Sequence, residues 1–217
     1  VLDKDGFEGL YEGKPVGVPV DAMLFGGRRP STIPLINEAK DWTHGVFMGA
    51  AAGSEITAAV ISDKIGQVRR DPMAMLPFCG YNMGDYWQHW IDIGKTLDAD
   101  KAPKIFNVNW FRKDDEGNFM WPGFGDNLRV LEWIIKRCEG EVDAQETAIG
   151  YLPYAKDINI EGLEGEVSLE SLESILDVDK DLWAAEADGI AEFYAKFGDK
   201  LPETLKEELE TLKANLK

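Results

Sequence analysis

Residues 16–32 read Val-Gly-Val-Pro-Val-Asp-Ala-Met-Leu-Phe-Gly-Gly-Arg-Arg-Pro-Ser-Thr. The apolar run over 16–25 predicts a strand, and the two glycines after it predict a turn. The turn leads into a short helix expected near residues 33–40. Strand, turn and helix in this order are typical of α/β proteins and of many anion-binding sites. We therefore expect an α/β fold with a candidate anion site just after the first strand.

The composition is that of a globular protein. The 217 residues are 44% hydrophobic and 29% charged, which is enough for one large or two small units and excludes collagen, disordered chains and disulfide scaffolds. No apolar run is long enough to span a membrane. Cys79 and Cys138 lack metal-type spacing, so we expect reduced thiols and a cytoplasmic location. The start at Val1, without a basic or apolar leader, suggests a cut inside a longer chain.

Negative charge is concentrated in the second part of the chain. Residues 139–217 carry 21 acidic and 7 basic side chains, whereas residues 1–138 carry 19 and 16. The formal net charge of −17 argues against a nucleic-acid partner, because phosphate backbones are bound by basic surfaces. We divide the chain into a lobe over 1–140 and an acidic, mainly helical cap over 141–217.

Helical periodicity is clearest in four segments. One follows Asn82 as a possible cap and ends at Gly94, and another follows Asp126 or Asn127 and ends before Gly140. In the acidic cap, two further helices are predicted, and they are expected to pack on the lobe because two heptads are too short for a stable zipper. The apolar positions expected on one face of these two helices are Trp183, Ala187, Ile190, Tyr194, Phe197, Leu205, Leu209, Leu212 and Leu216.

Aromatic residues surround a polar connector over 112–118. Strands are predicted over 104–111 and 119–121, which would bring Phe111 and Phe119 to opposite sides of that connector. Such a pair could stack on a planar base, with the amide of Asn127 nearby as donor and acceptor. Aromatic residues on a hairpin are more often part of the core, and Asn127 could simply cap a helix.

Other candidate sites are weaker. Arg28 and Arg29 could grip phosphate oxygens, or they could be structural arginines paired with carboxylates. Gly94-Lys95-Thr96 lacks the first glycine of a phosphate loop and closes a helix, so we reject it as one. His44 and His89 have no companion ligands in the pattern, so no metal site is predicted. Spacing alone thus indicates only a nucleotide or anion site.

Several runs together resemble one enzyme family, the GTP-dependent phosphoenolpyruvate carboxykinases. The resemblance runs from about residue 16 to the end and is most specific over 109–127. The runs are Phe25-Gly26-Gly27-Arg28-Arg29-Pro30, Trp42-Thr43-His44-Gly45-Val46-Phe47, Pro72-Met73-Ala74-Met75-Leu76-Pro77-Phe78, Asn109-Trp110-Phe111-Arg112-Lys113 and Phe119-Met120-Trp121-Pro122-Gly123-Phe124-Gly125-Asp126-Asn127.

The resemblance implies a lyase that converts oxaloacetate and GTP to phosphoenolpyruvate, GDP and CO₂ in gluconeogenesis or anaplerosis, with Mn²⁺ or Mg²⁺. It implies the carboxyl-terminal lobe of that fold, with a mixed sheet, flanking helices and a helical cap. Phe111 and Phe119 would sandwich the guanine, Arg28 would reach the nucleotide phosphates, and a mobile lid would lie near residues 54–68. The rest of the base pocket would be formed by Phe124, Gly125, Asp126 and Asn127.

The resemblance also implies what lies elsewhere. The family's phosphate loop, metal ligands and oxaloacetate-binding arginines are expected upstream of Val1, so this chain would hold no catalytic or metal-binding residue and would be inactive alone. Its partners would be GTP or GDP and the upstream part of the same enzyme, with oxaloacetate or phosphoenolpyruvate bound in the parent protein. The alternative is a stand-alone, non-catalytic nucleotide-binding or interaction module.

Overall fold

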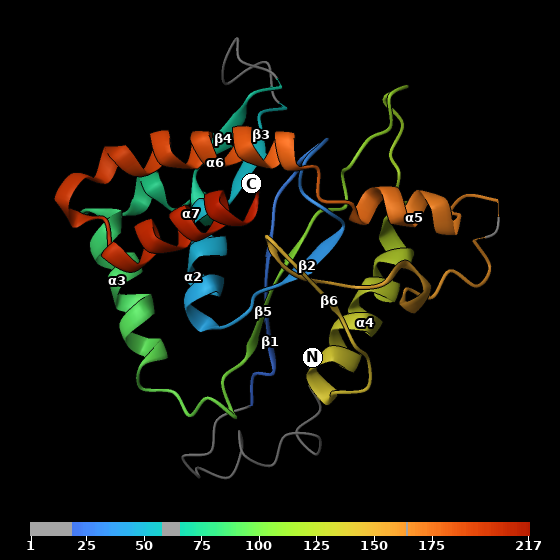
Figure 1. The fold of residues 1–217 in the computed structure, drawn as a ribbon, viewed down its shortest axis with the longest axis horizontal. Coiled ribbons are helices and arrows are strands. Elements are labelled where there is room, and N and C mark those ends of the chain that lie inside the picture. The colour runs from blue at the N-terminus through green and yellow to red at the C-terminus, as the bar shows by residue number, and fades with distance from the viewer. Residues whose placement is uncertain (1–18, 58–65, 164) are drawn as a thin grey trace.

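The structure is a computed structural model of the 217-residue chain, and it describes residues 19–57, 66–163 and 165–217. It has a mixed α/β architecture in which a sheet lies between two groups of helices (Figure 1). The strands are β1 (Ala22–Gly26), β2 (Ile36–Glu38), β3 (Gly53–Glu55), β4 (Val68–Arg70), β5 (Lys104–Val108), β6 (Gln145–Thr147) and β7 (Gly150–Leu152). The α-helices are α2 (Trp42–Ala51), α3 (Met83–Gly94), α4 (Asn127–Glu139), α5 (Leu169–Leu176), α6 (Lys180–Tyr194) and α7 (Glu203–Asn215).

The main sheet is five-stranded, in the order β1-β5-β2-β7-β6. β1 pairs with β5 in parallel, with Leu24 opposite Phe106, and the other neighbours are antiparallel. β3 and β4 form a separate hairpin. The sheet is therefore mixed, as expected, and it includes strands from both sides of residue 140.

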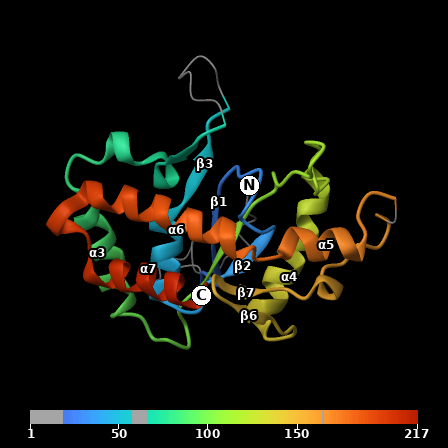
Figure 2. The same ribbon diagram turned by 45° about the horizontal axis from the view of Figure 1, so that its top comes forward.

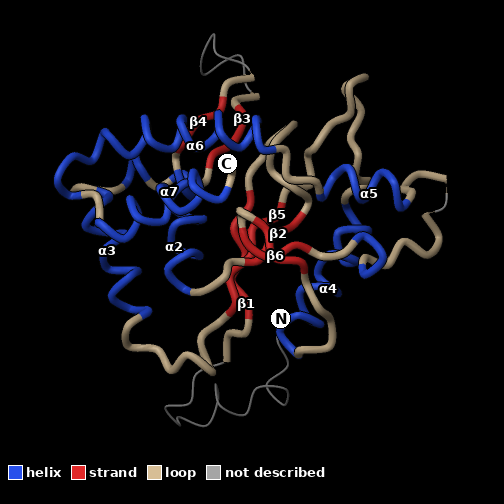
Figure 3. The backbone as a smooth tube through the Cα atoms, viewed as in Figure 1, coloured by secondary structure: helices blue, strands red, loops and turns tan. Residues whose placement is uncertain are grey.

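Helices cover both faces of the sheet. α2, α3, α6 and α7 gather on one side and α4 and α5 on the other (Figure 3), and the turned view shows the same grouping (Figure 2). α7 packs on α2 and α6, so the last helix lies against an element of the first 140 residues. Every apolar position expected on the common face of the two cap helices is buried in a single hydrophobic cluster that also includes Trp87, Phe106 and Trp133.

The predicted helix ends are largely correct. The Asn82 side chain caps α3 by accepting a hydrogen bond from the Gly84 backbone N–H at 2.8 Å. α4 ends at Gly140, whose φ of 72° is the left-handed conformation that glycine favours. Asp126 precedes α4 but makes no side-chain cap, and Asn127 is the first residue inside the helix.

Two predicted elements were wrong. The segment expected as a short helix near 33–40 contains strand β2 instead, because Ile36 and its neighbours are buried between β5 and β7. The helix starts only at Trp42, after Asp41 accepts a hydrogen bond from the His44 backbone N–H. Residues 119–121 form no strand, because only an isolated bridge joins Phe119 to Lys113 and the chain then turns to bury Trp121.

Candidate functional site

The candidate site lies where β1 and β5 end. These strands are parallel neighbours, so the loops that follow them, residues 27–32 and 109–113, leave the sheet side by side. The Lys113 backbone N–H donates to the Pro30 carbonyl at 2.9 Å and joins the two loops. Loops at the carboxyl ends of parallel strands are a usual place for ligands in α/β proteins.

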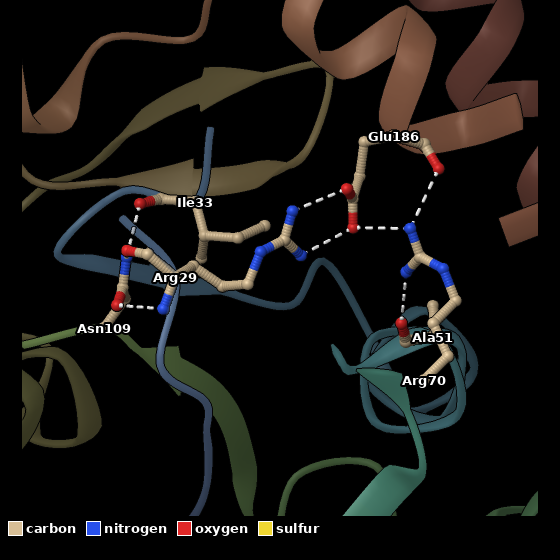
Figure 4. Close-up of polar contacts among 6 residues, drawn as sticks. All are labelled: Arg29, Ile33, Ala51, Arg70, Asn109 and Glu186. Carbon is tan, nitrogen blue, oxygen red and sulfur yellow. Dashed lines mark hydrogen bonds and ion pairs between the residues drawn. The ribbon is translucent and has the colours of Figure 1, made fainter. Parts of the chain in front are cut away.

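Asn109 fixes both loops. Its side chain is fully buried, and its Nδ2 donates to the carbonyls of Arg29 and Ile33, both at 2.9 Å (Figure 4). Its Oδ1 accepts from the backbone N–H groups of Arg29 and Phe111, both at 3.2 Å. All the hydrogen-bonding capacity of the carboxamide is used, so Asn109 is a structural centre of the site.

The neighbouring arginines have different environments. Arg28 is exposed, and its guanidinium lies over the Phe111 ring, 5.0 Å from the centroid, and donates to Thr57 Oγ1 at 2.8 Å. Arg29 is buried and donates to both carboxylate oxygens of Glu186, at 2.8 and 2.6 Å (Figure 4). The structural explanation is therefore correct for Arg29, whereas Arg28 is exposed and is not paired with a carboxylate among the described residues.

Glu186 on α6 is a buried carboxylate shared by two arginines. Its second partner, Arg70, lies 2.9 Å from Glu186 Oε1 and also donates to the Ala51 carbonyl (Figure 4). Burial alone would raise the pKa of Glu186, but hydrogen bonds and charge from Arg29, then Arg70, outweigh it and lower the pKa. Sequence analysis missed this residue, although a Glu three positions after Trp183 on an apolar helix face was a usable signal.

Phe111 and Phe119 are neighbours, as the connector between them suggested. Their ring centroids are 6.1 Å apart, with the planes inclined at 72°, so one ring points its edge at the other. A base held between parallel rings needs them roughly 7 Å apart, twice a carbon contact distance of about 3.5 Å. The rings therefore leave no slot in this arrangement, but Phe119 is 60% exposed and can rotate toward solvent.

Phe124 projects from the turn before α4. Its side chain is 96% exposed, and its φ of 49° is unusual for a residue with a Cβ. Strained backbone that presents an aromatic ring to solvent is more common at binding sites than elsewhere. Among the described residues, Phe124 has no ring contact with Phe111 or Phe119. It is close to that pair in sequence, five residues after Phe119.

The remaining predicted pocket residues surround that turn. Gly125 has open space where a Cβ would lie, and Asp126 pairs with Arg129 at 3.0 Å. Asn127 Oδ1 accepts a hydrogen bond from Trp121 Nε1 at 2.9 Å. An indole N–H can only donate, so the carboxamide must turn its oxygen toward Trp121 and its amino group away.

The described residues hold no cluster of three or more metal-type ligands, and most of the expected lid lies outside them. Within 19–57, 66–163 and 165–217, no three His, Cys, Asp or Glu side chains converge as metal ligands. Of the lid expected near 54–68, residues 58–65 lie outside the described part. Its described ends belong to the β3–β4 hairpin, where Ser54 Oγ accepts from the Arg28 backbone N–H at 3.0 Å.

No described helix is long and apolar enough to cross a bilayer.

Comparison with known proteins identifies the family. Residues 11–215 match the family described as "Phosphoenolpyruvate carboxykinase C-terminal P-loop domain". The chain is 58% identical over 203 residues to the GTP phosphoenolpyruvate carboxykinase of Treponema pallidum, and 54% identical over 203 residues to that of Renibacterium salmoninarum. These matches cover 93% and 94% of this chain but only 32% and 33% of the relatives, so the chain spans about a third of their length. The chain belongs to the GTP-dependent phosphoenolpyruvate carboxykinase family, within its carboxyl-terminal P-loop domain.

Proposed function

We propose that this chain is the guanine-nucleotide-binding portion of an enzyme that converts oxaloacetate and GTP to phosphoenolpyruvate, GDP and CO₂. The observation that carries the proposal is the grouping of Arg28, Phe111 and Phe119 at the ends of two parallel strands, in a chain of this family. An exposed guanidinium beside a half-buried ring, Phe111, and an exposed ring, Phe119, suits a ligand with both a planar base and phosphates. We infer that the fold of this chain is that of the carboxyl-terminal lobe of the carboxykinases. We also infer a cytoplasmic location, because the free thiols Cys79 and Cys138 suit a reducing compartment.

In this proposal each group has a stated task. Phe119 rotates from its edge contact and stacks on the guanine against Phe111, while Phe124 closes a further side of the base. Arg28 exchanges its contact with Thr57 for the nucleotide phosphates. Gly125 lets the backbone come close to the base, since nothing lies within 4 Å of the Cβ position there.

Asn127 gives a reason for guanine rather than adenine. Its oxygen is occupied by Trp121, and the carboxamide makes no other hydrogen bond to the described residues. The free amino group is a donor, which suits the O6 acceptor of guanine and opposes the amino group at the same position of adenine. Trp121, only 1% exposed, would thus set base choice without touching the base.

The described residues contain no group of three or more His, Cys, Asp or Glu side chains that could hold a metal ion. Mn²⁺ or Mg²⁺, the substrate arginines and the phosphate loop would belong to the other two thirds of such an enzyme. We therefore expect no turnover from the isolated 217 residues, and measurable carboxykinase activity from them would contradict this.

The aromatic contribution is tested by Phe119→Ala and Phe124→Ala in the complete enzyme. Base stacking contributes about 1–3 kcal/mol, so each variant should weaken GDP binding by roughly 5- to 150-fold in calorimetry. Tyr154→Ala is the control, because Tyr154 is a partly exposed aromatic residue that stacks with Lys156 outside the site. Unchanged GDP affinity in both phenylalanine variants would refute the base site.

Asn127→Asp tests base choice with almost no change of shape. The carboxylate still accepts from Trp121 Nε1, but the donor to the base is lost. GDP affinity should fall by roughly 5- to 150-fold, the effect of losing a good base contact, whereas ADP affinity should not fall. An equal loss for both nucleotides would show that Asn127 does not read the base.

A further inference from the structure

Strand β1 has one edge that pairs with no other described strand. It lies at the end of the main sheet, and β5 is its only partner among the described strands. The Asp21 carbonyl accepts from the Lys104 backbone N–H at 2.9 Å, so Asp21, Met23 and Phe25 direct their backbone groups toward β5. Successive residues of a strand alternate, so the N–H and C=O groups of Leu24 and its second neighbours Ala22 and Gly26 point away from the sheet.

Both faces of the same strand are partly open to solvent, although Phe25 packs near Gly49 of α2 and Trp90 of α3. Met23 lies opposite Ile105, which faces α2 at Gly45, and yet Met23 is 41% exposed. Leu24 lies opposite Phe106, which faces α4, and Leu24 is 43% exposed. Both helical layers that bury β5 thus leave large apolar side chains of β1 in solvent.

Such an edge is unusual for a finished sheet. Parallel strands in α/β proteins are normally buried on both faces, and natural edge strands are protected by charges, proline or short length. β1 is five residues long and carries no charge or proline over Ala22–Gly26. The features of β1 are those of an internal strand.

We propose that β1 is an internal strand of the complete protein, paired on its free edge with a strand from the part of the relatives' length that this chain lacks. The relatives are about three times as long as the matched region, so the additional chain is available. Pairing with a second copy of this chain is disfavoured by its net charge of −17. The proposal makes no use of the nucleotide site, so either can fail without the other.

Hydrogen exchange at single residues tests this in the 217-residue chain and in the complete protein. The amide of Leu24 should exchange rapidly in the shorter chain and roughly 100-fold or more slowly in the complete protein. The amides of Met23 and Phe25, which face β5, are the internal control and should be protected in both. Equal exchange of Leu24 in the two proteins would overturn the proposal, and so would protection that depends on self-association of the shorter chain.

A substitution gives a second measurement. Leu24→Lys should leave the melting temperature of the 217-residue chain nearly unchanged, because the side chain already meets solvent, and should lower it clearly in the complete protein. Leu182→Lys on α6 is the matched control, since Leu182 is 41% exposed. Equal effects of Leu24→Lys in both proteins would overturn the proposal.

Discussion

The buried Arg29–Glu186–Arg70 cluster gives the sharpest test of the fold. Glu186→Gln keeps the size of the side chain but removes the carboxylate that these two guanidiniums share, at 2.6 and 2.9 Å. All three side chains are at most 10% exposed, so water cannot replace the lost charge. Breaking a buried ion pair in this way costs about 3–5 kcal/mol.

The expected change in melting temperature follows from that free energy. For a domain of this size, 1 kcal/mol corresponds to about 2–4 °C, so Glu186→Gln should lower the melting temperature by roughly 6–20 °C at pH 7. Thermal unfolding followed by circular dichroism measures it. The control is Glu146→Gln, which removes a similarly short ion pair with Lys40 from a carboxylate that is 63% exposed, and should cost at most about 4 °C.

The pH dependence of stability gives a second test of the same cluster. The pKa of Glu186 is lower in the folded chain than in the unfolded one, so its stabilisation is present above the unfolded value of about 4.3 and is lost as the pH falls through the folded value. The difference in melting temperature between wild type and Glu186→Gln should therefore become smaller at acidic pH. A variant that melts within a degree of wild type at pH 7 would refute the reasoning.

Two further perturbations probe the core. Burial lowers the pKa of His44 to about 4, so only the unfolded chain binds this proton between pH 6.5 and 4, and wild type should lose up to about 3 kcal/mol of stability over that range. His44→Asn should remove that part of the slope in urea unfolding, and an unchanged slope would contradict it. A Cβ at Gly84 would lie 2.2 Å from the Lys200 carbonyl, so Gly84→Ala should lower the free energy of unfolding by about 1–3 kcal/mol. Gly80→Ala is the control, because a Cβ there meets open space and should leave stability unchanged in the same assay. Equal effects of the two substitutions would refute the contact.

Local signals predicted the helices well because caps and apolar stripes are encoded in neighbouring residues. The Asn82 cap and the Gly140 stop are read within a few positions of the helix they bound. β2 was mistaken for a helix because its burial comes from β5 and β7, which lie far away in the sequence. Glu38, the last residue of β2, is buried there and has Lys104 and Arg137 as partners.

The candidate site was predictable in its residue types but not in its partners. Arg28 and Arg29 are adjacent and chemically identical, and it is the position of Glu186 that distinguishes the buried, ion-paired guanidinium of Arg29 from the exposed one of Arg28. The contact between Phe111 and Phe119 was expected from the polar connector, whereas the inclination of their rings depends on packing that a sequence does not express. Their role in nucleotide binding stays a prediction.

The distance along the chain between Arg29 and Glu186 has a consequence for biosynthesis. The two residues are 157 positions apart, and Arg70 is also synthesised long before Glu186, the carboxylate with which it pairs. A nascent chain therefore carries both cations without their anion until Glu186 has been synthesised, and a product truncated before Glu186 cannot neutralise them.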